Sequence, residues 1–308
     1  MPCADDAAKG RFVVYGFAVL AALIVAVGEV VQQRMAAQAP PQDNLSPKLL
    51  LWLVQQPRWL AGIACTFAGD GAFSVAVSQG SVVVVEAVFV IRLLFALTLS
   101  AFWGSHRVPV KELLGGLAMV VGLAVFLLAL RPTGRAIAVP DVRWSWGAGV
   151  PVAVAAGLAI AARRRIGAPR ALLLGLGAGI VFGVQAALIQ AAVHKMTKGG
   201  LLSLLSGWQP YAVVVVALFG MLLVQSAFES APLSDSYPGV VTAQLLCAIG
   251  IGLFVLDGHI ELGVANLVIG LLALVALIFG MVVVTRSTVL SHSAAHSDLP
   301  PNLEHERE

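Results

Sequence analysis

Hydrophobic positions in this chain gather in long, nearly uninterrupted runs, without the alternating pattern of strands or the one-faced pattern of soluble helices. A bilayer core of about 30 Å requires about 20 apolar residues per crossing helix. Nine runs come close to this length, and we therefore predict nine transmembrane helices. The runs cover residues 12–34, 58–79, 82–103, 111–130, 146–162, 171–193, 205–228, 237–256 and 263–285.

The polar segments between the runs are short. Residues 37–57 are rich in proline and contain a short amphipathic piece, Leu49 to Val54, which we expect to lie on the membrane surface. The segment after Arg286 is rich in Ser, His and Glu and has no hydrophobic periodicity. Such a composition is typical of a solvated, disordered tail.

Composition restricts the class of protein further. Hydrophobic residues make up 59% of the chain and charged residues 11%, whereas soluble domains carry about a quarter charged residues. This balance excludes a soluble enzyme, a disordered protein and a nucleic-acid binder. The sequence contains no nucleophile–base pair, metal-ligand cluster or phosphate-binding loop, so we predict neither an enzyme nor a cofactor. The predicted fold class is an all-α polytopic membrane protein.

The distribution of Lys and Arg between the loops predicts an orientation. The side that carries the C-terminus collects more of them, including the run Arg163–Arg165 in a short loop. Cytoplasmic loops carry an excess of basic residues. We therefore predict a multi-pass protein of the bacterial plasma membrane with its C-terminus in the cytoplasm.

The nine runs group as four, one and four. A four-helix unit returns to its starting side, so a single fifth helix makes the second unit begin on the opposite side, as in the inverted repeats of transporters. The ends of the second and seventh runs, Ala76–Val82 and Ala227–Leu233, both place small residues at a very tight turn. The predicted divisions are an N-terminal tail (1–11), a first repeat (12–130), a linker with the fifth helix (131–165), a second repeat (166–286) and a disordered tail (287–308).

Small residues recur at four-residue spacing within several runs. Gly175, Gly179 and Gly183 form one such stripe on the sixth run. Helices in lipid associate through close backbone approach at small residues. The stripe is therefore expected to face another helix, either as static packing or as a surface that slides during transport.

Three segments carry a resemblance to a known family. They are the hairpin Ala76–Val85, the segment Gly207-Trp208-Gln209-Pro210-Tyr211 and the segment Gln225-Ser226-Ala227-Phe228. Together with the inverted halves they resemble the drug/metabolite transporter superfamily, and the nearest branch is actinobacterial proteins similar to NIPA-type magnesium transporters. The resemblance covers residues 12–286 and implies a central cavity between two inverted halves.

The chain departs from that family at the expected cavity. Where such proteins carry a proline after a Val-Gln pair in the third helix, this chain reads Val85-Glu86-Ala87. The carboxylate–proline pair of the eighth helix reads Ala243-Gln244-Leu245. The resemblance therefore predicts the fold more firmly than the substrate.

Two ionisable residues are predicted to meet near the centre of the membrane. From a hairpin tip at Gly80, a rise of 1.5 Å per residue places Asp70 about 15 Å deep and Arg92 about 18 Å deep. Ionisable groups at such depth are costly and default to functional candidates. We expect an ion pair, which either fixes the register of the hairpin or lets Arg92 bind an anionic substrate group while Asp70 holds it in place.

Two further carboxylates occur in the runs. Glu86 lies about 9 Å below the same tip without a predicted cation at its depth. We expect it to be protonated and either to couple proton movement to transport or to donate a hydrogen bond to Ser74 or Tyr237. Glu29, close to Arg34, is expected to reach the interface by snorkelling.

Polar side chains in the second half are predicted to line a cavity or to join helices by hydrogen bonds. The candidates for substrate binding are Gln185, Gln209, Tyr211 and Gln244, with Arg92 and Asp70 from the first half. Trp208-Gln209-Pro210 is expected either to break the seventh helix or to form an ordinary proline kink.

These observations predict a secondary transporter that moves a small polar or anionic amphiphilic solute by alternating access. Its expected partners are the lipid bilayer, a small-molecule or lipid-like substrate, and a protein partner or a second copy of the chain. One alternative is a non-transporting membrane subunit that scaffolds or stabilises a partner complex. Another is a Mg2+ transporter, which the central positive charge of Arg92 disfavours.

Overall fold

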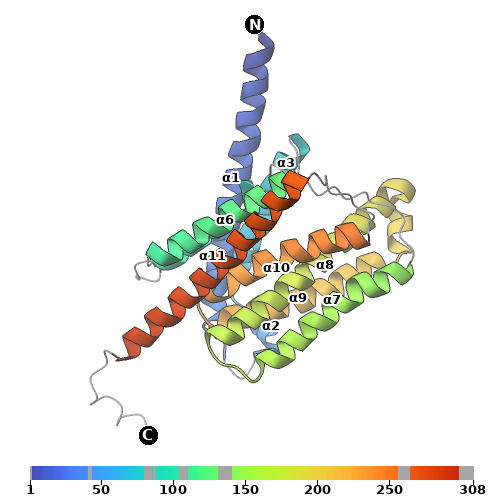
Figure 1. Cartoon of the computed structure of the whole chain (residues 1–308). Helices are drawn as coiled ribbons and strands as arrows, with labels where there is room; N and C mark the ends of the chain where they lie inside the picture. Colours follow the sequence, from blue (N-terminus) through green and yellow to red (C-terminus); the bar gives the residue numbers. More distant parts are fainter. Residues whose placement is uncertain are drawn as a thin grey trace.

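The computed structural model describes residues 2–40, 44–79, 85, 88–103, 110–130, 141–255 and 264–297. Within these ranges all regular structure is helical. The helices are α1 (Pro2–Ala36), α2 (Pro47–Val54), α3 (Pro57–Gln79), α5 (Arg92–Trp103), α6 (Val110–Leu130), α7 (Asp141–Ala162), α8 (Ala168–Leu205), α9 (Gln209–Ser230), α10 (Leu233–Phe254) and α11 (Val264–Ser297) (Figure 1).

The prediction of an all-helical membrane-type protein is confirmed. Among the described residues, seven helices are long and apolar enough to cross a bilayer: α1, α3, α6, α7, α8, α9 and α11. The remaining predicted runs, 82–103 and 237–256, overlap α5 and α10. Helix α1 begins at Pro2 and α11 continues to Ser297, so helical structure extends beyond the predicted spans at both ends.

Helix α2 is the amphipathic piece predicted after the first run. The Ser46 side chain caps the helix by accepting a hydrogen bond from Lys48 N (3.3 Å). Leu49 and Leu53 are fully buried in the main hydrophobic cluster. Because α2 packs on α3 and α9, part of its apolar face covers protein, whereas Leu51 and Val54 are exposed. Its place on the membrane surface stays a prediction.

Glycines at the contacts between helices set the distance between the helices of the principal pairs. A Cβ on Gly28 of α1 would lie 2.6 Å from the carbonyl oxygen of Gly62 on α3, and a Cβ on Gly122 of α6 would lie 2.8 Å from that of Ala273 on α11. A Cβ on Gly179 would run into the backbone of α10. The predicted stripe on α8 therefore packs against α10, and close backbone approach holds these pairs together.

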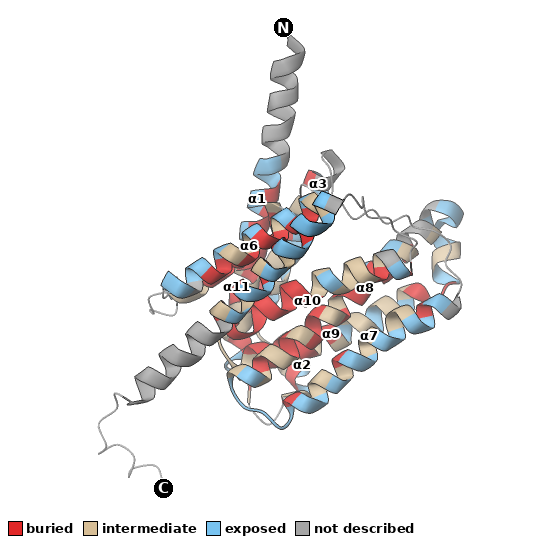
Figure 2. Ribbon diagram, viewed as in Figure 1, coloured by how far each residue is buried: buried red, intermediate tan, exposed pale blue. Residues whose placement is uncertain are grey.

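The helices form two groups that share one core, and the pair α6 and α11 packs beside them. Helices α7 to α10 lie together, α1 packs on α3 and α5, and α6 and α11 lie side by side (Figure 1). Buried residues concentrate where helices face one another, and exposed residues lie on the outward faces (Figure 2). Many exposed side chains are large and apolar, among them Phe102, Phe254 and Phe279. Such an outward surface suits a hydrocarbon environment.

Candidate functional site

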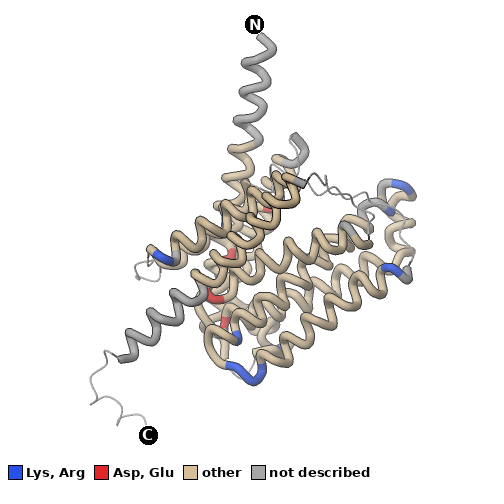
Figure 3. The backbone as a smooth tube through the Cα atoms, viewed as in Figure 1, with Lys and Arg blue, Asp and Glu red and all other residues tan. Residues whose placement is uncertain are grey.

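A cavity of about 500 Å3 lies between the two groups of helices. Its walls come from α1, α3 and α5 on one side and from α8, α9 and α10 on the other. Its polar lining residues are Glu29, Gln32, Trp59, Thr66, Asp70, Arg92, Gln185, Tyr237 and Gln244. The volume falls in the range of small-molecule sites. Most described Lys and Arg residues lie at helix ends, whereas acidic residues lie within the bundle (Figure 3).

Arg92, the first residue of α5, is the basic residue of this cavity lining. Its guanidinium carbon lies 4.6 Å from the centroid of the Phe89 ring, at cation–π distance. The Phe89 ring in turn lies 4.7 Å from that of Phe73 on α3. The positive charge of Arg92 attracts both Asp70 and Glu29. The structure thus brings Asp70 and Arg92 to one site, as predicted.

Glu29 lies in the same cavity, and its predicted position at the interface is wrong. The crossing part of α1 runs from Tyr15 to Ala36, so Glu29 lies about 5 Å from its middle. The hydroxyl of Tyr237 on α10 lies beside the carboxyl group. Glu29 Oε2 is enclosed and accepts no hydrogen bond from any described residue. The sequence carried a signal for this position. Gln32 follows Glu29 by three residues, so the two polar side chains lie on the same face of the helix.

A chain of buried amides connects the two groups of helices. Gln225 Nε2 on α9 donates to Gln32 Oε1 on α1 (3.0 Å), and Gln32 Nε2 donates to Thr66 Oγ1 on α3 (2.9 Å). The Thr66 hydroxyl donates to the carbonyl oxygen of Gly62 (3.2 Å). Buried polar groups require such partners. The chain fixes one wall of the cavity and joins α9 to α1.

The other predicted site residues differ in where they lie relative to the cavity. Gln185 on α8 and Gln244 on α10 line the cavity. Gln209 is buried at the start of α9, while Tyr211 is 61% exposed and donates to the carbonyl oxygen of Leu205 (3.0 Å). Neither of these two is a cavity-lining residue, because α9 begins at Gln209 and reaches the cavity two turns later. Glu86 lies outside the described residues.

The loop after α1 is tied to the second group of helices. Asn44 Nδ2 donates to the carbonyl oxygen of Ser226 (3.1 Å) and to Ser230 Oγ (3.2 Å), both on α9. Arg170 Nη2 on α8 donates to Asn44 Oδ1 (2.7 Å), and Leu45 N donates to Ser226 Oγ (3.1 Å). Leu45 has a φ of 57°, an unfavourable conformation for a residue with a branched side chain. We call these contacts the Asn44 bridge.

Metal-ligating side chains do not gather in the described part of the chain. There, no three or more His, Cys, Asp or Glu residues lie close enough together to hold a metal ion. The two carboxylates of the cavity lie beside a guanidinium, which repels a divalent cation. The described lining offers amide, hydroxyl and charged side chains.

Comparison with known proteins finds one informative similarity. The chain is 28% identical over 274 residues to an uncharacterized protein of Corynebacterium glutamicum, and the match covers 89% of this chain and 95% of that protein. No protein-family model matches the chain. No solved structure matches it either.

Proposed function

We propose that this protein is a secondary transporter of the drug/metabolite type that moves a small polar or anionic amphiphilic solute across the plasma membrane. The observation that carries the proposal is the polar cavity, whose walls come from both groups of helices. Charged and amide side chains are expensive within a membrane and mark solute pathways there. Transporters built from repeats bind their substrates between the repeats.

The packing of the helices supports the inverted-repeat architecture that the proposal requires. In the first half α1 packs on α3 and α5, and in the second half α8 packs on α9 and α10 in the corresponding order. Helices α6 and α11, the last of each half, pack on one another. The proposal counts α5 and α10 as crossing helices as well, which makes nine spans among the described helices, with α7 joining the halves.

The proposed binding mode uses side chains from both halves. Arg92 binds an acidic group of the solute, while Asp70 and Glu29 keep the guanidinium in place and accept hydrogen bonds from solute donors. Gln185 and Gln244 hydrogen-bond to the solute from the second half. A solute that contacts both halves stabilises the conformations in which they are close, and alternating access requires such a difference in binding free energy. Glu86 keeps its predicted role in proton coupling.

The test is a screen for stabilising solutes followed by flux measurements. Purified protein is melted in the presence of a panel of small organic acids, amino acids and phosphate esters, and each stabilising compound is then tested for uptake into proteoliposomes. We expect Gln244→Leu to abolish stabilisation and uptake. Tyr211→Phe, a polar position outside the cavity, should behave as wild type. Equal stabilisation and uptake by wild type and Gln244→Leu would refute the binding site.

The stabilisation screen, together with native mass spectrometry, separates the two other functions. A non-transporting subunit predicts that no solute stabilises the protein and that native mass spectrometry of the protein from its own membrane finds a stoichiometric protein partner. A magnesium transporter predicts stabilisation by Mg2+ at concentrations where Na+ has no effect. The guanidinium of Arg92 near both carboxylates argues against this last outcome.

A further inference from the structure

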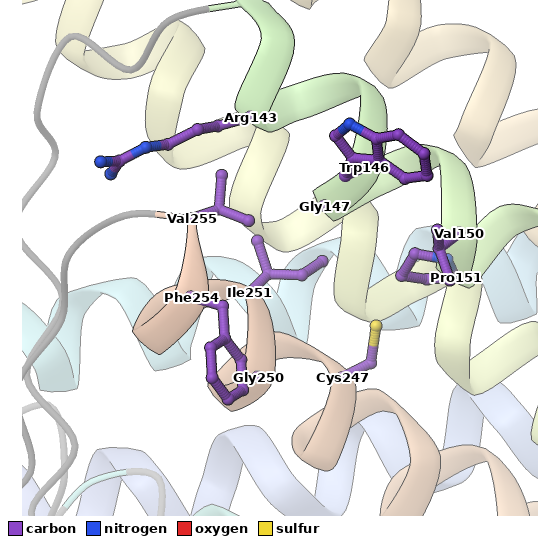
Figure 4. A pocket seen from close by; sticks show the side chains of 10 residues that line it. All are labelled: Arg143, Trp146, Gly147, Val150, Pro151, Cys247, Gly250, Ile251, Phe254 and Val255. Atoms are coloured by element: carbon purple, nitrogen blue, oxygen red, sulfur yellow. The ribbon is translucent and has the colours of Figure 1, made fainter.

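A second concavity, of about 530 Å3, lies between α7 and α10 on the outside of the bundle. We call it the α7–α10 groove. Figure 4 shows its lining: Arg143, Trp146, Gly147, Val150, Pro151, Cys247, Gly250, Ile251, Phe254 and Val255. Arg143 is the one charged residue among them, and the rest of the lining is apolar or small apart from the indole N–H and the thiol. Phe254 is 85% exposed, so the groove opens outward.

The length of the groove matches one leaflet of a bilayer. From Arg143 to Pro151 the α7 wall covers nine residues, and the eight rises between them make about 12 Å. The α10 wall covers the same length from Val255 to Cys247. Half of a hydrocarbon core is about 15 Å thick. The groove therefore extends from the membrane surface at Arg143 to near the middle of the membrane.

The surface end of the groove carries the features of a headgroup region. Trp146 is 71% exposed, and indole rings concentrate at this level of the membrane. Trp144 packs edge-on against Trp208 at the start of α9, with ring centroids 6.0 Å apart. A Cβ at the neighbouring Gly207 would lie 2.9 Å from Lys195 Nζ, so a second cation lies at this end of the bundle. Of these, Arg143 is the basic side chain that lines the groove itself, and it favours a negatively charged headgroup.

The deep part of the groove is open because of a glycine. A Cβ built on Gly250 meets no atom within 4 Å, whereas one built on Gly147 would run into the side chain of Val255. A Cβ at position 250 thus meets no protein atom, and a larger side chain there would extend into the groove. Gly252, on a different face of the same helix, is equally open but does not line the groove.

We propose that the α7–α10 groove binds one acyl chain of an anionic phospholipid, whose headgroup lies at Arg143. An acyl chain is the apolar ligand that a bilayer supplies to a groove of this depth. The charge at one end selects the lipid headgroup. This lipid site is distinct from the central cavity, with which it shares no lining residue.

Native mass spectrometry with defined lipids tests this proposal. The full-length protein in neutral detergent is mixed with equal amounts of phosphatidylglycerol and phosphatidylcholine, and the retained lipids are counted. We expect wild type to retain phosphatidylglycerol about fivefold better, the effect of one basic side chain near an anionic headgroup. Arg143→Gln should remove this preference. Gly250→Leu should lower retention of both lipids, and Gly252→Leu should match wild type.

Several results would overturn the proposal. One is equal retention of the two lipids by wild type, and another is unchanged retention by Gly250→Leu. A dimer that carries no lipid and that Gly250→Leu separates would assign the groove to a second copy of the chain. Melting temperatures of all variants show whether each one is folded, and the Arg143→Gln comparison does not depend on filling the groove.

Discussion

The relative importance of the two carboxylates beside Arg92 can be tested by double-mutant cycles. Glu29 is half-buried and has an enclosed oxygen without a hydrogen-bond partner among the described residues, whereas Asp70 is exposed. Removal of one partner from a buried pair of charges costs about 3–5 kcal/mol, but pairs of exposed charges contribute about 0–1 kcal/mol. The structure therefore predicts that Arg92 is coupled more strongly to Glu29 than to Asp70.

The expected magnitudes follow from this difference in burial. Because Glu29 is only half-buried, we take the lower end of the range and expect Arg92→Gln to lower the free energy of unfolding by about 3 kcal/mol. In a Glu29→Gln background the same substitution should cost about 1 kcal/mol, a coupling energy of about 2 kcal/mol. In an Asp70→Asn background it should still cost more than about 2 kcal/mol.

The assay is reversible unfolding in mixed micelles of nonionic detergent and dodecyl sulfate, followed by far-ultraviolet circular dichroism. Asp70→Asn and Glu29→Gln alone serve as the single-variant arms of each cycle. A coupling energy for Asp70 and Arg92 equal to or larger than that for Glu29 and Arg92 would refute the reasoning. Such a result would restore the simple pair expected from the depths of the two residues in the hairpin.

Three further predictions concern the contacts between helices. Gln225→Leu leaves Gln32 Oε1 without its donor and should lower the free energy of unfolding by about 1–3 kcal/mol in the same assay; an unchanged value would mean that the amide chain contributes nothing. Gly179→Val should drive α8 away from α10 and abolish the monodisperse peak in size-exclusion chromatography. Gly157→Val should keep this peak, because a Cβ at Gly157 meets nothing within 4 Å. Identical profiles for the two variants would contradict the packing. Asn44→Ala should lower the free energy of unfolding by about 1–3 kcal/mol, and wild-type stability would show that the Asn44 bridge is not maintained in solution.

Hydropathy was sufficient to locate the helices because crossing helices must satisfy their backbone hydrogen bonds internally and present apolar side chains outward. All nine runs overlap helices of the structure. The tight packing of the Gly179 stripe was also predictable, since only small residues permit such an approach. These are properties of a single segment and its neighbours in the sequence.

The residues that line the cavity were harder to predict, because they depend on where each helix ends and on which helix faces pack against one another. Glu29 was assigned to the interface from its distance to the end of the run, yet α1 continues to Ala36 and brings it near the middle. Tyr211 was assigned to the cavity from its residue type, but its place in the first turn of α9 leaves it exposed. Gln185, Gln244 and Arg92 lie well within their runs and line the cavity, while their role in substrate binding stays a prediction.

The Asn44 bridge has a consequence for the populations of conformations. Any motion that separates the α1 loop from α8 and α9 breaks the four hydrogen bonds that Asn44 and Leu45 make. At about 1 kcal/mol of net stabilisation each, these bonds favour the joined arrangement by about 4 kcal/mol. This corresponds to about one separated molecule in a thousand at equilibrium. A ligand that favours separation would therefore bind with an apparent affinity about a thousandfold below its intrinsic affinity, and loss of Asn44 would recover much of that difference.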